Sequence, residues 1–202
     1  VFSGSEVTIS KSSFTNSTGS TGAALNFYSS KAVAITDTQI NNNTSSGNGV
    51  LYANASVLTL DNVTATGNKA SKGGLIYTSG ASTTFDINGG SFTGNTAANG
   101  GVAFTENATL DFNGSVISGN TASSNGGAVY AKEGSSAKLY FTDCEVSSNT
   151  SKSGGVIYTE PGATVTVENS ELTQNSTTSN GGAIYVKEAT ALTVNGSAFN
   201  SN

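Results

Sequence analysis

A module of about 26 residues recurs eight times along this 202-residue chain, and this recurrence limits the possible folds more than any other feature. Each copy opens with two apolar residues separated by one residue and adds a third apolar residue five positions later. It ends three positions after that, usually on Asn. A period of roughly 20 to 50 residues is typical of solenoids, in which each unit buries its apolar face by stacking on the next. We therefore expect one stacked module and no separate domains.

Four positions of the module are nearly fixed. The opening pair alternates with other residues, which is the period of a β-strand, and no stretch shows a helical period. The pairs are Val7/Ile9, Val33/Ile35, Leu58/Leu60, Phe85/Ile87, Leu110/Phe112, Leu139/Phe141, Val165/Val167 and Leu192/Val194. The third apolar residues are Phe14, Ile40, Ala65, Phe92, Ile117, Val146, Leu172 and Phe199. The Asn position holds Asn43, Asn68, Asn95, Asn120, Asn149, Asn175 and Asn202, with Ser17 in the first copy.

A second motif, Gly-Gly-x-x-Tyr/Phe, follows the Asn in most copies. The complete copies begin with the pairs Gly73-Gly74, Gly100-Gly101, Gly126-Gly127, Gly154-Gly155 and Gly181-Gly182. Weaker copies end at Tyr52 and Phe27. The spacing between the aromatic residue and the next strand varies, as in segments 78–83 and 131–137. Because repeat proteins place length variation in loops, we expect these segments to protrude as turns on one face.

Short strands, fixed corners and a constant period together predict an all-β fold. We expect a single-stranded right-handed parallel β-helix, a β-solenoid of about eight coils with three short strands per coil. Residues 1–202 would form one β-helical domain, and we interpret it as a segment of a longer repeat region.

The fixed residues are explained by building such a coil. A column of stacked Asn side chains, including Asn95 and Asn120, is expected to face inward at a corner and to bond the coils above and below. Paired glycines such as Gly126-Gly127 permit backbone conformations or close approaches that a Cβ would block. A column of small residues contains the lone Cys144, which we interpret as a small buried side chain. These motifs are therefore predicted to be structural, and the binding residues stay unidentified.

Several motifs are similar to those of one known family. Gly-Gly-Ala-Val (126–129), Gly-Gly-Ala-Ile (181–184), Phe-Thr-Gly-Asn (92–95) and Phe-Asn-Ser-Asn (199–202) resemble the GGA(I/L/V) and FxxN repeats of the chlamydial polymorphic membrane proteins. Other copies depart from this pattern, with Val, Leu or Ile where the family has Phe. The resemblance implies an autotransporter-type β-helical passenger that is displayed at the cell surface and acts in adhesion.

Composition excludes several functions. The net charge is −5 and the eight Lys are scattered, which argues against binding to nucleic acid or to an acidic membrane surface. No apolar run approaches the roughly 18 residues of a membrane span. With one Cys and no His, the chain offers neither a zinc site nor a nucleophilic triad. We expect no cofactor, metal site or catalytic residue, and the Ser/Thr/Asn-rich surface favours an extracellular or cell-surface location.

Two weaker functional hypotheses rest on single columns. Asp86 and Asp111 are expected to stack on an outer face, where they could act as paired carboxylates of a polysaccharide-active enzyme. Ice binding would need a regular Thr array. The Thr-rich column that contains Thr59 is broken by Asp86, Asp111 and Tyr140. A second set, containing Thr66 and Thr93, is separated from its neighbouring column by a corner.

The preferred hypothesis is a non-enzymatic surface protein that binds a protein or glycan partner. The alternative is a structural subunit of a filament or envelope, which self-associates by end-to-end stacking of coils, because bare coil ends are open edges. Among the Asn-x-Ser/Thr sequons, Asn54 and Asn107 lie on the variable segments and are the best candidates for glycosylation.

Overall fold

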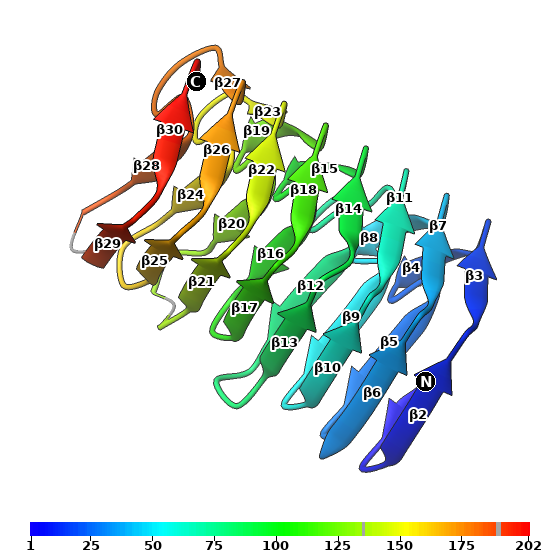
Figure 1. Ribbon diagram of the computed structural model, residues 1–202. Coiled ribbons are helices and arrows are strands. Elements are labelled where there is room, and N and C mark those ends of the chain that lie inside the picture. Colours follow the sequence, from blue (N-terminus) through cyan, green and yellow to red (C-terminus); the bar gives the residue numbers. More distant parts are fainter. Residues whose placement is uncertain (135, 189–190) are drawn as a thin grey trace.

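The computed structural model describes residues 1–134, 136–188 and 191–202, and these residues form a parallel β-solenoid of eight coils without helix (Figure 1). The chain advances coil by coil, so its two ends lie at opposite ends of the rod. The predicted fold class, the coil number and the period are confirmed, since paired residues on neighbouring coils are separated by about 26 positions.

Three sheets of eight strands run the length of the rod. Sheet A consists of β1 (Phe2–Ser3), β5 (Leu25–Tyr28), β9 (Leu51–Asn54), β12 (Ile76–Ser79), β16 (Ala103–Thr105), β20 (Val129–Ala131), β24 (Ile157–Thr159) and β28 (Ile184–Val186). Sheet B consists of β2 (Glu6–Ser10), β6 (Ala32–Thr36), β10 (Val57–Asp61), β13 (Thr84–Asn88), β17 (Thr109–Asn113), β21 (Lys138–Thr142), β25 (Thr164–Glu168) and β29 (Ala191–Asn195). Sheet C consists of β3 (Ser13–Thr15), β7 (Gln39–Asn41), β11 (Thr64–Thr66), β14 (Ser91–Thr93), β18 (Val116–Ser118), β22 (Glu145–Ser147), β26 (Glu171–Thr173) and β30 (Ala198–Asn200).

A fourth, discontinuous wall corrects the expectation of three strands per coil. Its two parts are joined at the third coil by single bridges through Lys69 and Lys72. The segments of this wall are rich in Ser, Thr and Ala and lack an alternation of large apolar residues, so they gave no strand signal. The wall consists of β4 (Thr18–Thr21), β8 (Thr44–Asn48), β15 (Thr96–Asn99), β19 (Thr121–Asn125), β23 (Thr150–Ser151) and β27 (Ser176–Thr177).

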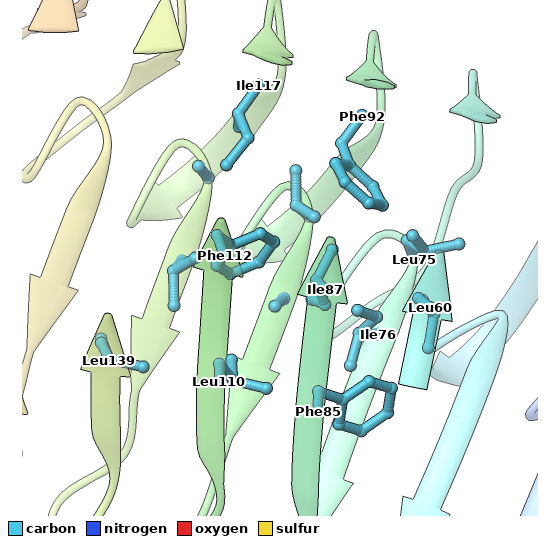
Figure 2. Packing of buried hydrophobic residues seen from close by; sticks show 14 of the residues in the cluster. Leu60, Leu75, Ile76, Phe85, Ile87, Phe92, Leu110, Phe112, Ile117 and Leu139 are labelled. Atoms are coloured by element: carbon cyan, nitrogen blue, oxygen red, sulfur yellow. The ribbon is translucent and has the colours of Figure 1, made fainter. Parts of the chain in front are cut away.

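The apolar columns of sheets A, B and C meet in the core of the rod (Figure 2). Phe85, Ile87 and Phe92 are fully buried, and the rings of Phe92 and Phe112 pack edge to face at 5.9 Å. Burial of each such side chain stabilises the fold by about 1.5 to 3 kcal/mol. The apolar positions read from the sequence are therefore the inward positions of sheets B and C.

Two corners in each coil turn on a residue with positive φ. The residue before each column Asn adopts this left-handed conformation, with φ of 65° at Gly67 and 57° at Ser148. The corner between sheets B and C has the same feature, as at Gly114 and Asp143. Gly, Asn and Asp tolerate this region best, which accounts for much of their abundance at these corners.

The Asn column forms a continuous hydrogen-bonded ladder at the corner after sheet C. Asn120 Nδ2 donates to the carbonyl oxygen of Phe92 one coil back and to Asn149 Oδ1 one coil ahead, both at 2.9 Å. Asn120 Oδ1 accepts from the backbone N–H and from Nδ2 of Asn95, at 2.9 and 3.0 Å. The Asn120 amide thus uses both donors and both lone pairs, although it is fully buried. Equivalent bonds link Asn43, Asn68, Asn95, Asn120, Asn149, Asn175 and Asn202.

A second ladder, made of hydroxyl groups, lies at the corner between sheets B and C. Ser170 Oγ accepts from the backbone N–H of Cys144 at 3.0 Å and donates to the carbonyl oxygen of Glu168 at 2.8 Å. Cys144 occupies the same column and is 2% exposed, and burial raises the pKa of its thiol. The small column of the sequence therefore contains buried groups that bond the backbone, as Ser115, Cys144 and Ser170 do.

The two positions of the Gly-Gly motif require glycine for different structural reasons. The first, such as Gly126, has a φ of 66°. The second, such as Gly127, has no room for a side chain, because a Cβ there would collide with the carbonyl oxygen of Gly155 in the next coil. The motif therefore bends the chain and lets adjacent coils approach closely.

The first coil departs from the predicted alignment of this motif. Asn26, and not Phe27, pairs with Tyr52 of the aromatic column. Phe27 points into the core and stacks on Phe2 at 5.3 Å. Gly22, with a φ of 56°, takes the place of the first glycine, so the motif is shifted by one residue from its expected position.

The Asn ladder generates the first prediction. Asn120→Ala removes the acceptor of the buried backbone N–H of Asn95, one of the two acceptors of Asn95 Nδ2 and one donor to the carbonyl of Phe92, and should lower the free energy of unfolding by about 3 to 5 kcal/mol. Urea denaturation followed by circular dichroism measures this loss. Asn113→Ala is the control on the exposed surface of the same coil and should change stability by less than about 0.5 kcal/mol. Equal losses in both variants would contradict the ladder.

The Gly-Gly motif generates the second prediction. Gly127→Ala forces two coils apart and should cost about 3 kcal/mol or more. Gly114→Ala introduces a side chain at a positive φ, which Gly127 lacks, but meets no atom within 4 Å, so only backbone strain of about 1 to 2 kcal/mol is expected. Thermal unfolding of both variants distinguishes steric collision from strain, and a smaller loss at position 127 than at position 114 would refute the collision.

Candidate functional site

The aromatic residues of the Gly-Gly motif form one stacked column on the outer face of sheet A. Their neighbours in the strands, such as Ile76 and Ile157, fill the core, so the rings point away from it. Neighbouring rings lie 4.9 to 5.7 Å apart, with interplanar angles of 8 to 27°. Tyr77, Phe104 and Tyr158 are only 3 to 8% exposed, because stacking covers the faces of their rings. The aromatic column consists of Tyr52, Tyr77, Phe104, Tyr130, Tyr158 and Tyr185.

A charged column runs beside the aromatic one, two residues after the aromatic residue in four consecutive coils. It consists of Glu106, Lys132, Glu160 and Lys187, so that charges of opposite sign alternate from coil to coil. Lys132 Nζ lies 3.1 Å from Glu106 Oε1, and Lys187 Nζ lies 2.9 Å from Glu160 Oε2. Such partly exposed ion pairs contribute about 1 kcal/mol at most, so the alternation chiefly avoids like-charge contacts between stacked coils.

Tyrosine hydroxyl groups join the two columns. Tyr77 donates to Glu106 Oε1 at 2.6 Å, and Tyr130 and Tyr158 donate to Glu160 Oε1 at 3.4 and 3.3 Å. Tyr52 and Ser79 share a hydroxyl–hydroxyl bond of 3.0 Å. The equivalent partner for an aromatic residue at position 104 is Lys132, whose ammonium group cannot accept a hydrogen bond. The aromatic residue there is Phe104, which has no hydroxyl to satisfy.

Burial and the neighbouring carboxylates perturb the acid–base behaviour of this surface. Desolvation, together with the hydrogen bond to Glu106, raises the pKa of Tyr77 well above its usual range. Desolvation and the charge of Glu160 do the same to the pKa of Tyr130. Partial burial alone would raise the pKa of Glu106, but the bonds from Tyr77 and Lys132 outweigh it and lower that pKa. Glu106 is therefore an anion held by two donors.

The turns from sheet A to sheet B differ in length from coil to coil, and we call them the A–B edge. Two residues separate β9 from β10, whereas six separate β20 from β21. The corner between sheets B and C is two residues long in every coil. Figure 1 shows the turns before β13 and β21 along the same lower side of the rod. The described residues of the A–B edge are 4–5, 29–31, 55–56, 80–83, 106–108, 132–134, 136–137, 160–163 and 187–188.

Of the two candidate glycosylation sites, Asn54 lies beside this edge and Asn107 lies within it. Asn54 Nδ2, the atom that would carry a glycan, donates to Ser79 Oγ at 2.8 Å in a half-buried position. Asn107 is also half-buried, and its Oδ1 accepts from the backbone N–H of Ser136 at 3.0 Å. Glycosylation of either residue stays a prediction.

The paired carboxylates lie where the sequence placed them, on the outer face of sheet B. Asp86 and Asp111 are direct register partners, and partial burial and the charge of Asp86 raise the pKa of Asp111. The next residue of the column is Tyr140. Within the described ranges, no group of three or more His, Cys, Asp or Glu side chains could hold a metal ion.

The hydroxyl-bearing residues considered for ice binding occupy separate walls. Thr66 and Thr93 share a 3.0 Å hydroxyl contact on sheet C, whereas Thr121 and Thr150 share one of 3.2 Å on the fourth wall. The described outer surface thus lacks one flat Thr array that spans both sets.

Comparison with known families identifies the repeat. The model of the Chlamydia polymorphic membrane protein (Chlamydia_PMP) repeat matches residues 114–132 and 169–187. The chain carries repeats of this type. Each matched segment runs from the corner between sheets B and C, through the Asn ladder and the Gly-Gly pair, to a Lys of the charged column. Each match to the repeat therefore covers most of one coil.

The matched segments hold the Gly-Gly-Ala copies at 126–129 and 181–184, but not the Phe-x-x-Asn copies at 92–95 and 199–202. In their place they hold Ile117 and Leu172, each three residues before a ladder Asn. Comparison with curated proteins and with solved structures gave no match. No helix among the described residues is long and apolar enough to span a membrane.

Sequence reasoning missed the aromatic and charged columns as a surface. The signal was present, because strand alternation places Tyr77 on the opposite side from the apolar Ile76. The charge alternation at Glu106, Lys132, Glu160 and Lys187 becomes visible only when coils with turns of different length are aligned in register. The column was not recognised in the sequence because the turns between its members differ in length.

The perturbed tyrosines generate the third prediction. The folded state holds the pKa values of Tyr52, Tyr77, Tyr130 and Tyr158 above the unfolded value near 10, so the unfolded chain loses protons first as pH rises. Stability contributed by these groups is present below pH 10 and is lost at higher pH. Absorbance titration should show fewer than seven tyrosines ionising near pH 10 in the native chain and all seven in urea. Identical native and denatured titrations would contradict this environment.

Proposed function

We propose that this chain is a length of surface-displayed, non-enzymatic β-helical rod that acts in adhesion. Two observations support the proposal: repeats of the Chlamydia polymorphic membrane protein type, and an edge on which turns of two to six residues follow one another from coil to coil. The first favours a location at the cell surface. The second provides the recognition surface, because loops on a rigid scaffold tolerate sequence and length changes that the walls do not.

The A–B edge suits a protein or glycan partner. Its six-residue turn carries the exposed Lys132, Glu133 and Ser136, and the four-residue turn 80–83 carries the exposed Ala81 and Ser82. Mixed charges and small polar groups are the side chains expected of a polar contact surface. The partner would lie along one side of the rod and touch several coils at once.

The chemistry of the walls gives little support to an enzyme. Asp86 and Asp111 lie on an outer sheet face, beside Tyr140 and Thr59. Glu106 and Glu160 are held by tyrosines and lysines in the charged column. The proposed activity therefore needs no catalytic group and no cofactor.

End-to-end stacking of copies is a second candidate function. The last coil exposes Leu192, Val194 and Phe199 to between 39 and 45% around a hollow of about 460 Å³. A coil of the same repeat would cover this hollow with its own apolar columns, as each coil covers its neighbour. Light scattering distinguishes the candidates: growth of mass with concentration favours stacking, and a strictly monomeric chain contradicts it.

The adhesion proposal generates the fourth prediction. The variant replaces residues 133–137 with Asn-Ala, the dipeptide that follows Glu106, and residues 80–83 with Ala-Ser, the dipeptide that follows Asn54. These changes shorten two of the longer turns to lengths that other coils of the fold already have. Beads coated with this variant should adhere to cultured cells about tenfold less than wild type, which corresponds to about 1.4 kcal/mol.

A control variant replaces the outward Ser118 and Ser147 of sheet C with Ala and should adhere like wild type. Circular dichroism verifies the β-fold of both variants. Wild-type adhesion by the short-turn variant, or equal loss in the sheet C control, would show that the A–B edge is not the recognition surface.

A further inference from the structure

Six of the seven tyrosines of this chain lie in two runs along the outer face of sheet A. Tyr28, Tyr52 and Tyr77 form the first run, and Phe104 separates it from the second. The second run is Tyr130, Tyr158 and Tyr185. The seventh tyrosine, Tyr140, lies on sheet B.

The sheet holds neighbouring phenol rings at short and fixed distances. The ring centroids of Tyr130 and Tyr158 are 5.4 Å apart, and those of Tyr158 and Tyr185 are 5.1 Å apart. Tyr52 lies 5.2 Å from Tyr28 and 5.7 Å from Tyr77. Because hydrogen-bonded strands fix these spacings, each phenol meets its neighbour at an effective concentration far above that of free tyrosine.

Carboxylates are hydrogen-bonded to three of the phenols and can accept their protons. Glu106 accepts the hydrogen bond of Tyr77, and Glu160 accepts those of Tyr130 and Tyr158. One-electron oxidation of tyrosine releases the phenol proton, because the radical cation is a strong acid. A hydrogen-bonded carboxylate receives that proton without large movement, so these contacts favour formation of neutral tyrosyl radicals.

The composition leaves tyrosine as the main target of one-electron oxidants. The chain contains no Met, Trp or His, and its single Cys144 is 2% exposed. Tyr28 is 38% exposed and gives an oxidant access to the first run. Tyr185, at the last position of the second run, is half-buried. Neighbouring rings with centroids 5.1 to 5.7 Å apart are close enough for electron transfer between an oxidised ring and the next ring inward.

We propose that the aromatic column, together with Tyr28, is a site of oxidative cross-linking, in which tyrosines of adjacent coils are joined through their ortho carbons as dityrosine. Two phenols each lose one electron and one proton, and the two radicals couple to form one carbon–carbon bond. The coupled rings then regain aromaticity by moving their ortho hydrogens to oxygen. Hydrogen peroxide, acting through a haem peroxidase, takes up the two electrons and two protons and becomes two molecules of water.

Each such bond would tie one coil to the next. Solenoids are stabilised through contacts between neighbouring units, so they open coil by coil. A chain with one Cys cannot close an internal disulfide across this opening. Dityrosine would supply that covalent tie in an oxidising environment, independently of which partner the A–B edge binds.

The test is oxidation of the folded chain with a haem peroxidase and hydrogen peroxide at low protein concentration. Dityrosine fluorescence is measured in the monomer band of a denaturing gel, and trypsin with a glutamate-specific protease yields the linked peptides for mass spectrometry. We expect links among the four adjacent pairs Tyr28–Tyr52, Tyr52–Tyr77, Tyr130–Tyr158 and Tyr158–Tyr185.

Substitutions with Phe remove pairs without emptying the stack, since Phe104 already occupies one position. Tyr158→Phe removes two of the four pairs and should halve the yield. The double variant Tyr52→Phe, Tyr158→Phe removes all four pairs and should abolish the monomer signal, although five tyrosines remain. Tyr140→Phe is the matched control and should retain the full yield.

Several results would overturn the proposal. These are a wild-type yield in the double variant, linked peptides that contain Tyr140, bonds formed only between chains, or an equal intramolecular yield from the urea-unfolded chain. Circular dichroism establishes that the variants are folded. Tyr185→Phe, at the last coil, gives a second measurement, because it should remove only the Tyr158–Tyr185 peptide and about a quarter of the yield.

Discussion

Parallel stacking in register is the constraint on which the rest of this structure depends. Each coil places the same position of the module directly above its equivalent in the coil before, so every column must be compatible with itself. An amide meets this condition, because its donors and acceptors can bond an identical amide, and the Asn ladder follows. Buried charge does not meet it, and the core contains none among the described residues.

The same constraint organises the outer face of sheet A. Identical aromatic rings stack favourably, with about 0.5 to 1.5 kcal/mol for each contact beyond burial. Identical charges repel, and the charged column avoids this by alternating Glu106, Lys132, Glu160 and Lys187. Where Lys132 offers no acceptor, Phe104 replaces tyrosine. Outer columns are thus selected by their vertical neighbours in the same manner as the core.

The requirement that stacked coils match residue for residue is weakest at the A–B edge. The two corners on either side of sheet C hold the hydroxyl ladder and the Asn ladder, and each needs a fixed number of residues to align its side chains between coils. The A–B turns carry no ladder of this kind along their whole length, and they range from two to six residues. The coils therefore differ most from one another along this edge, and a partner that distinguishes one coil from another would bind there.

The sequence by itself determined the periodicity, the inward apolar columns and the Asn and Gly corners, because each is a local pattern repeated at constant internal spacing. The fourth wall was not predictable in this way, since its Ser, Thr and Ala residues carry no strand alternation. The shift of the motif in the first coil was not predicted either, because Phe27 has the residue type of the aromatic column but lies in register with core residues. Only the tertiary structure aligned Glu106 with Lys132 and the tyrosines with their carboxylates, because turns of unequal length separate these residues in sequence while hydrogen bonds between coils hold them in one column.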